Sequence, residues 1–254
     1  MDLPSVGLGT MGIDDPSVIA TALDAGYRHL DTAQIYENEH VVGEGLANSP
    51  VPREDVTLAT KLWVDSLAPH DVESGTRASL DRLGVERIDL LYVHRPRGGY
   101  DPEGTMAALD AVTDAGLTER LAVSNFTPEQ YDRAQTYCDR PLVANQVEFH
   151  PLFQQSGVLE HAREQGYTVV AYSPLAGGEV FDVPEIRTVA EKHDTTPAAV
   201  SIAWVLSHDG VVTIPKASSR EHLQANLAAR ELSLDSEDVE RIDGIDREVE
   251  LFPE

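Results

Sequence analysis

The sequence contains a single cysteine, Cys138, in 254 residues. One cysteine excludes an internal disulfide and a metal cluster held by several thiolates. No run approaches the ~18 consecutive apolar residues that a membrane span needs. The first residues, Met1–Pro4, lack the basic region and apolar stretch of a secretion signal. We therefore expect a cytoplasmic protein with no membrane partner.

Basic residues are scarce as well, with 19 Lys and Arg against 44 Asp and Glu and a formal net charge of −25. Such a charge repels phosphate backbones, so no nucleic-acid partner is expected. The carboxylates are spread along the chain, and the only lysines are Lys61, Lys192 and Lys216. This pattern resembles the surface of halophilic proteins; the alternative is an ordinary acidic cytosolic enzyme.

The chain also lacks linkers and low-complexity stretches, so residues 1–254 are expected to form one domain. Eight short runs, several rich in Val, Ile and Leu, predict strands buried on both faces: Ser5–Thr10, His29–Ala33, Thr57–Leu62, Leu90–His94, Leu121–Asn125, Ala144–Phe149, Thr168–Tyr172 and Val211–Pro215. Amphipathic helical patterns fill the gaps, and Asp235–Ile245 predicts an extra C-terminal helix. Eight strand–helix units predict an α/β fold, a single (β/α)8 TIM barrel.

The segment Gly7–Gly12 spells G-x-G-x-x-G, with Asp31 downstream. Read literally, this is the dinucleotide-binding fingerprint of an open-sheet dehydrogenase. That fingerprint needs a full strand before it and a helix that opens at the last glycine. Only six residues precede Gly7, and two carboxylates, Asp14 and Asp15, follow Ile13. A tight turn at the end of a barrel strand is the favoured interpretation.

Three chemically active side chains end successive predicted strands: Asp31, Lys61 and His94. In a parallel barrel these ends adjoin, and Tyr36 follows in the loop after the second strand. A tyrosine ordinarily titrates near pH ~10, and an adjacent ammonium lowers its pKa. We expect Asp31 and Lys61 to tune Tyr36 as a proton donor to a carbonyl oxygen, which His94 would direct.

Each of these residues has a plainer interpretation when it is taken alone. Asp31 and Lys61 could form a structural ion pair, His94 could be a satisfied core histidine, and Tyr36 could be amphipathic cover. Their joint appearance in this order, together with the scarcity of lysine, favours the catalytic interpretation.

At this point the sequence resembles the aldo-keto reductase family over nearly its whole length. The segments that carry the resemblance occur in the family's order: Gly26–Ala33, Tyr36–Glu39, Val123–Phe126, Asn145–Pro151, Ala171–Leu175 and Ile214–Lys216. The branch that it resembles most is the prokaryotic one that includes 2,5-diketo-D-gluconate reductases.

The resemblance implies a monomeric NAD(P)H-dependent oxidoreductase that acts on a small aldehyde or ketone, with no metal. It implies that Tyr36 is the general acid, that Trp63 forms part of the substrate wall, and that Tyr172 stacks on the nicotinamide. It further implies a cofactor-binding set of Ser124, Asn125, Gln146, Ser173, Leu175, Lys216 and Asn226.

The sequence departs from the family pattern where the cofactor's 2′-phosphate is usually held. Ala217 replaces a serine and His222 replaces an arginine, which leaves Ser218 and Arg220 as substitutes. We therefore expect NADPH to be used with NADH also possible. Arg95 stands where many members have tryptophan, and alternation along a strand predicts that it faces outward. The chain stops at Glu254, so a long C-terminal specificity loop is expected to be missing.

A second class of function uses the same fold, namely a cofactor-binding regulatory subunit like the β subunits of potassium channels. The complete set of Asp31, Tyr36, Lys61 and His94 favours the enzyme without excluding the subunit. An open-sheet dehydrogenase is the third possibility, and it would show six strands in place of eight.

Overall fold

The computed structural model describes residues 3–253 of the chain. Its eight strands form one sheet in the order β1 to β8, and every neighbouring pair is parallel. The strands are β1 (Leu8–Gly9), β2 (His29–Asp31), β3 (Thr57–Leu62), β4 (Ile88–Val93), β5 (Thr118–Ser124), β6 (Leu142–Glu148), β7 (Thr168–Tyr172) and β8 (Val211–Thr213). A parallel bridge between Val6 and Thr213 joins the first and last strands, so the sheet closes on itself.

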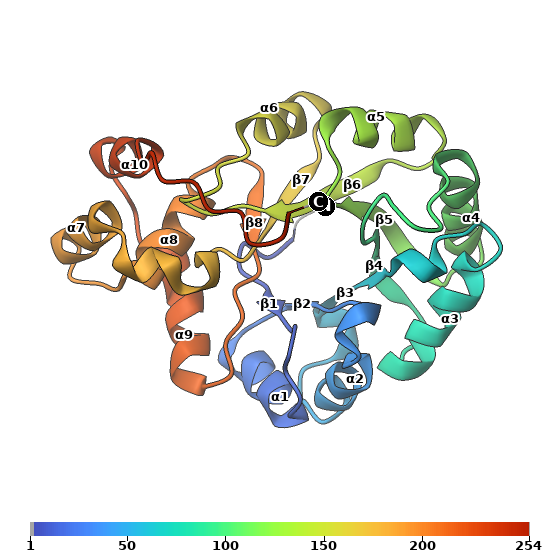
Figure 1. Ribbon diagram of the computed structural model, residues 1–254. Helices are drawn as coiled ribbons and strands as arrows, with labels where there is room; N and C mark the ends of the chain where they lie inside the picture. Colours follow the sequence, from blue (N-terminus) through green and yellow to red (C-terminus); the bar gives the residue numbers. More distant parts are fainter. Residues whose placement is uncertain (1–2, 254) are drawn as a thin grey trace.

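Helices surround the ring of strands, as Figure 1 shows. They are α1 (Pro16–Ala25), α2 (Glu39–Ala47), α3 (Val72–Leu83), α4 (Pro102–Asp114), α5 (Pro128–Thr136), α6 (Ser156–Gln165), α7 (Pro184–Lys192), α8 (Pro197–Leu206), α9 (Arg220–Ala228) and α10 (Ser236–Asp243). Short 3₁₀ turns lie between them: η1 (Gln34–Tyr36), η2 (Arg53–Asp55), η3 (Val64–Ser66), η4 (Ala176–Asp182) and η5 (Ala229–Glu231).

The predicted (β/α)8 barrel and its extra C-terminal helix, α10, are both confirmed. The boundaries differ at a few elements. The first strand is shorter than predicted, because only Leu8 and Gly9 pair with β2. Helix α4 begins at Pro102, because the Asp101 side chain caps it by accepting a hydrogen bond from the Gly104 amide.

The glycine motif belongs to the barrel wall, so the open-sheet interpretation is wrong. A Cβ atom on Gly9 would lie 2.6 Å from the carbonyl oxygen of Ile214, so β1 approaches the end of β8 too closely for any side chain. Gly12 has a φ of +70° in the turn that follows. No helix opens at Gly12, since α1 begins at Pro16 with Asp15 as its cap.

Two apolar clusters follow from the alternation of side chains along each strand. The smaller one takes alternate residues of successive strands and fills the barrel interior: Ala59, Leu90, Tyr92, Ala122, Ala144, Val170, Val212 and Ile214. The larger one packs the outer faces of the strands against the helices. Within residues 3–253, no helix combines the length and the apolar character that crossing a membrane requires.

Candidate active site

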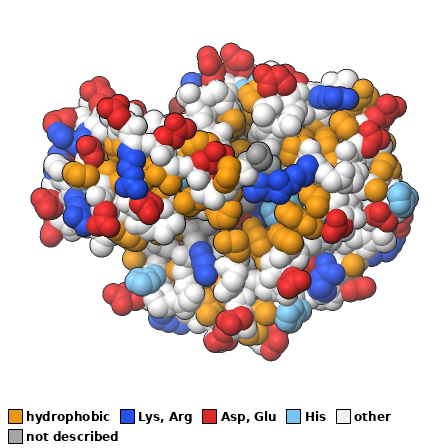
Figure 2. Space-filling model, viewed as in Figure 1, with side chains coloured by type: hydrophobic (Ala, Val, Ile, Leu, Met, Phe, Trp, Pro, Cys, Tyr) orange, Lys and Arg blue, Asp and Glu red, His pale blue; other side chains and the backbone are white. Residues whose placement is uncertain are grey.

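A cavity of about 880 Å³ opens where the strands of the barrel end. In Figure 2 it is the hollow near the centre of the face, bordered mainly by hydrophobic side chains. Three of the four predicted catalytic residues line the cavity: Asp31, Tyr36 and His94. The fourth, Lys61, is buried and bonded to Asp31. The structure therefore brings together the residues that the sequence singled out.

The Asp31 carboxylate is the anchor of this group. One of its oxygens accepts a hydrogen bond from the Lys61 ammonium, and the other accepts one of 2.7 Å from Gln146 Nε2 on β6. Lys61 Nζ also donates to the Thr32 carbonyl oxygen at 2.8 Å. Both partners of the ion pair are buried, and the Asp31 carboxylate and the Thr32 carbonyl oxygen together fix the position of the ammonium.

Tyr36 lies on η1, whose short turn carries it back over the barrel mouth. Lys61 Nζ is 5.3 Å from the centroid of the Tyr36 ring. Burial raises the pKa of the Tyr36 phenol, and the nearby Lys61 charge offsets only part of this effect. The expectation that Lys61 would leave the phenol with a lowered pKa is therefore wrong, because desolvation of the phenolate outweighs the attraction of the ammonium. The phenol consequently stays protonated at neutral pH.

His94 lies beside Tyr36, with 6.0 Å between the two ring centroids, and packs edge-on against Trp63 at 4.9 Å. Burial lowers the pKa of His94 to about 2, and the charges of Lys61 and Arg95 act in the same direction. A neutral imidazole can donate one hydrogen bond without bringing a charge into the cavity.

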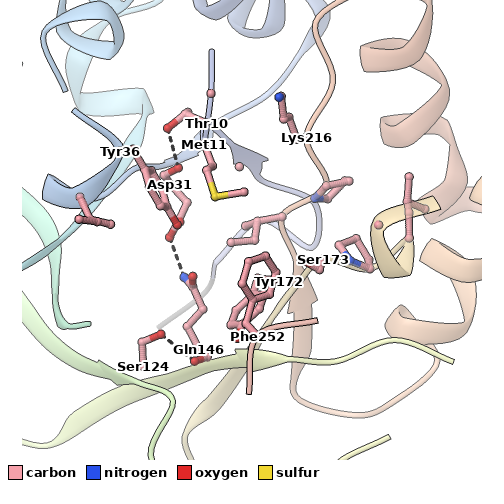
Figure 3. A pocket seen from close by; sticks show the side chains of 18 of the residues that line it. Thr10, Met11, Asp31, Tyr36, Ser124, Gln146, Tyr172, Ser173, Lys216 and Phe252 are labelled. Carbon is pink, nitrogen blue, oxygen red and sulfur yellow. Dashed lines mark hydrogen bonds between the residues drawn. The ribbon is translucent and has the colours of Figure 1, made fainter. Parts of the chain in front are cut away.

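The opposite wall is built from amides and hydroxyls that orient one another. Ser124 Oγ donates to the Gln146 carbonyl oxygen at 2.9 Å. Asn125, at a φ of +61°, donates from Nδ2 to the His94 carbonyl oxygen at 3.1 Å and accepts from the Tyr172 hydroxyl at 2.9 Å. Figure 3 shows Gln146 reaching toward Asp31 from below and the Tyr172 ring facing the cavity. The amides of Asn125 and Gln146 are thus held in fixed orientations.

The remaining expected cofactor residues divide into two groups. Ser173, Leu175 and Lys216 line the cavity, with Lys216 at the end away from Gln146 (Figure 3). The others do not line it: Ser218, Arg220, His222 and Asn226. The Arg220 guanidinium instead pairs with Asp24 at 2.8 Å on the surface.

Arg95 and Phe252 are two of the cavity-lining residues that the sequence did not predict. Arg95 does not face outward, since it lines the cavity and only 9% of it is exposed. The strand β4 ends at Val93, so strand alternation no longer sets the direction of residue 95. Phe252, near the end of the chain, also lines the cavity and packs edge-on against Tyr172 with 5.8 Å between centroids.

Glu148, at the end of β6, holds the C-terminal segment in place. Its buried carboxylate accepts hydrogen bonds from the backbone amides of Leu251 at 2.7 Å and Phe252 at 3.0 Å. His150 Nε2 lies 2.9 Å from the same carboxylate. In Figure 1 this segment (red) runs from α10 over the ring of strands. The C-terminal segment thus borders the cavity through Phe252.

Comparison with known proteins agrees with this geometry. The aldo/keto reductase family model matches residues 5–247. The methylglyoxal reductase DkgB of Salmonella typhi is 37% identical over 252 residues, which is 97% of this chain and 94% of the relative. The 9,11-endoperoxide prostaglandin H2 reductase of Trypanosoma cruzi is 35% identical, with 97% and 89% covered. A solved putative 2,5-diketo-D-gluconic acid reductase B superposes with a TM-score of 0.92 at 33% identity, with 95% and 87% covered.

Proposed function

Since this chain belongs to the aldo/keto reductase family, we propose that it reduces an aldehyde or ketone to an alcohol with NADPH, using Tyr36 as the general acid. The observation that carries the proposal is the convergence of Tyr36, Lys61 and His94 on one cavity around the Asp31 carboxylate. The reverse reaction, oxidation of an alcohol, would use the same groups.

Tyr36 can deliver the proton that a carbonyl oxygen needs as it becomes an alcohol. Its raised pKa keeps the phenol protonated, and the buried Lys61 ammonium stabilises the phenolate left after transfer. Burial alone lowers the pKa of Lys61, but the charges of Asp31 and Tyr36 outweigh burial and raise it. The lysine therefore stays charged throughout the transfer.

His94 and Trp63 would position the substrate. The neutral imidazole of His94 can donate a hydrogen bond to the carbonyl oxygen and so hold it beside the Tyr36 hydroxyl. Trp63 packs against this imidazole and offers an apolar surface to the rest of the substrate. Both groups belong to the wall formed by the loops after β3 and β4.

The cavity fits a nicotinamide cofactor, whose reduced ring supplies a hydride to the carbonyl carbon. Ser124, Asn125 and Gln146 present fixed polar groups suited to a carboxamide, and the Tyr172 ring offers a flat face for stacking. Ser173 and Leu175 would line the path of the pyrophosphate, and Lys216 offers a cation for phosphate at the far end. Amides lie at one end of the cavity and a cation lies at the other, which supports binding of the cofactor with its nicotinamide at the first end and its phosphates at the second.

Preference for NADPH over NADH should be modest. Ser218, Arg220 and His222 lie outside the cavity, and Arg220 is already paired with Asp24. A histidine at position 222 cannot make the two parallel hydrogen bonds with which a planar arginine holds a phosphate. Lys216 would supply most of the phosphate contact, and Asn226 would lie near the adenine. A kcat/KM ratio of several thousand in favour of NADPH would contradict this assignment.

The proposal is tested by following NADPH and NADH oxidation with a panel of aldehydes and ketones, at low and at high KCl. Turnover with at least one carbonyl compound, at rates well above a Tyr36→Phe control, is the expected result. Tight cofactor binding with no oxidation by any compound would favour a cofactor-binding regulatory subunit instead.

A further inference from the structure

Gln34 lies at the start of η1, two residues before Tyr36, and its side chain joins this turn to two other elements. Its Oε1 atom accepts a hydrogen bond of 2.8 Å from the backbone amide of Trp63. Its Nε2 group donates to the Gly75 carbonyl oxygen and to Ser79 Oγ on α3, each at 3.1 Å. One side-chain amide thus connects the turn that carries Tyr36, the segment after β3 and helix α3.

The segments that Gln34 joins carry the proposed proton donor and the lysine beside it. Trp63 lies two residues after Lys61 on the segment that leaves β3. The hydrogen bond from the Trp63 amide therefore holds the turn against the strand that presents Lys61. The Lys61 ammonium lies 5.3 Å from the Tyr36 ring centroid. The Trp63 ring in turn packs against His94 with 4.9 Å between centroids, so the same contact also supports the wall proposed to face the substrate.

Helix α3 is shaped to receive this side chain. A Cβ atom on Gly75 would lie 2.8 Å from Ser66 Cβ, which is too close, and 3.5 Å from Gln34 Nε2. Glycine therefore lets α3 approach near enough for its carbonyl oxygen to reach the amide. The other acceptor, Ser79, is fully buried. A 3₁₀ turn of three residues is too short to hold its own position, so contacts from outside the turn decide where Tyr36 lies.

We propose that Gln34 is a positioning residue, which fixes the Tyr36 hydroxyl relative to Lys61 and to the substrate wall. The inference rests on the proposed function, because it concerns the geometry of the same reaction. Both amide hydrogens and the amide oxygen of Gln34 have partners, so the side chain is held in one orientation. A displacement of about 1 Å near a reacting group can cost about 100-fold in rate. Gln34 acts through Tyr36, since it does not itself line the cavity.

Gln135 on α5 provides a matched control. Its Nε2 group donates to the carbonyl oxygens of Cys138 at 3.2 Å and Arg140 at 3.0 Å, and its Oε1 atom accepts from the Leu142 amide at 2.8 Å. Both glutamines are half-buried. Gln135 contacts the start of β6, at the end of the barrel away from the cavity, and does not line the cavity. An effect on stability alone should therefore appear equally at both positions.

The test compares three variants with the wild type. Gln34→Met and Gln135→Met each remove three hydrogen bonds while keeping the length of the side chain. Gln34→Glu keeps an oxygen that accepts from the Trp63 amide but loses the donor to the Gly75 carbonyl oxygen. We would measure kcat and KM with a reducible aldehyde, the Kd of NADPH, and the melting temperature of each protein.

Gln34→Met should lower kcat by about 10- to 100-fold because Tyr36 is no longer held in place. The Kd of NADPH should change by less than about threefold, since the proposed cofactor contacts lie on the opposite wall. Gln34→Glu should retain more of kcat than Gln34→Met. Gln135→Met should lower the melting temperature to a similar extent and leave kcat unchanged. An unchanged kcat in Gln34→Met would overturn the proposal, as would an equal loss of kcat in Gln135→Met.

Tryptophan fluorescence separates this inference from the proposed reaction. The chain has two tryptophans, and Trp204 is fully buried, so quenching by acrylamide reports mainly on Trp63. Gln34→Met should increase this quenching by releasing the Trp63 backbone, and Gln135→Met should not. If the wild type reduces no carbonyl compound, the proposed function fails. The positioning role then stands only if quenching rises in Gln34→Met alone, and it falls if quenching is unchanged.

Discussion

Asp31 on β2 and Gln146 on β6 meet across the inside of the barrel, where the Gln146 amide donates a hydrogen bond of 2.7 Å to the carboxylate. The other carboxylate oxygen receives the Lys61 ammonium. One buried carboxylate therefore orients a group on each side of the cavity: the lysine that contacts Tyr36 and the amide proposed to hold the nicotinamide. This connection holds the proposed proton donor and the proposed cofactor site in a fixed relative position.

Replacing Tyr36 with phenylalanine should abolish most carbonyl reduction while cofactor affinity changes little. The variant keeps the ring that packs over Lys61 but loses the proton, and loss of a positioned general acid costs about 10²–10⁴ in rate. Steady-state kinetics and cofactor fluorescence titration would measure the two effects. Tyr137→Phe, at an exposed position, is the control, and near wild-type turnover of Tyr36→Phe would refute the assignment.

The activity should be insensitive to pH over the neutral range. Because the pKa of His94 is lowered to about 2, the imidazole stays neutral and produces no loss of kcat/KM between pH 5 and 8. Because the pKa of Tyr36 is raised, the proton donor is lost only as pH rises above the ordinary tyrosine value. A profile of kcat/KM against pH checks both statements. An acidic limb near pH 6–7 that disappears in His94→Asn would contradict the first.

Helix α10 should be held to α7 by Asp238. Its carboxylate accepts hydrogen bonds from Lys192 Nζ at 2.8 Å and His193 Nε2 at 2.7 Å. Burial acts to raise the pKa of Asp238, but these contacts outweigh it and lower the pKa from 3.8 to about 2. A carboxyl whose pKa is lower in the folded protein than in the unfolded chain stabilises the fold at pH values above its unfolded-state pKa. This stabilisation is lost as the pH falls through the folded-state pKa.

Asp238→Asn should therefore lower the free energy of unfolding at pH 7 by about 2 kcal/mol, with the difference from wild type shrinking as pH falls from 4 toward 2. Urea unfolding of both proteins across this range is the measurement. Glu237→Gln, at the neighbouring exposed position, should have an effect of less than about 0.5 kcal/mol. A difference that does not depend on pH would show that the carboxylate charge is not what matters.

Glu148→Gln should release the C-terminal segment. A glutamine has one side-chain oxygen in place of two. It therefore cannot accept hydrogen bonds from both the Leu251 and Phe252 amides and also keep the contact with His150. Loss of Phe252 from the cavity wall should raise KM for the carbonyl substrate more than KM for the cofactor. Faster cleavage of the tail by carboxypeptidase would report its release. Glu250→Gln is the control, and an unchanged cleavage rate in Glu148→Gln would argue against this role.

The melting temperature should rise steadily with KCl, and activity should be highest well above physiological salt. The carboxylates that give the net charge of −25 repel one another across the molecule in dilute buffer, because the Debye length is ~30 Å at 0.01 M salt. At 1 M it falls to ~3 Å, which confines repulsion to close neighbours. A melting temperature equal in dilute buffer and in molar KCl would remove the halophilic interpretation without affecting the proposed reaction.

The barrel could be predicted from the sequence because its signals are local. Each strand and helix is marked by its own hydrophobic pattern, and eight such units leave little choice of architecture. Asp31, Lys61 and His94 could be placed together for a related reason. Parallel strands end at one edge of the barrel, so residues at successive strand ends become neighbours whatever the details of packing.

Only the tertiary structure shows which further residues line the cavity and how burial changes the pKa of Tyr36. Arg95 turns inward because it lies past the end of β4, where strand alternation no longer applies. Phe252 reaches the cavity through contacts with Glu148, more than 100 residues away in the chain. The pKa of Tyr36 rises because burial, which depends on every surrounding element, outweighs the single charge of Lys61. Direction beyond a strand end, long-range contact and desolvation are properties of the packed molecule, and no local pattern encodes them.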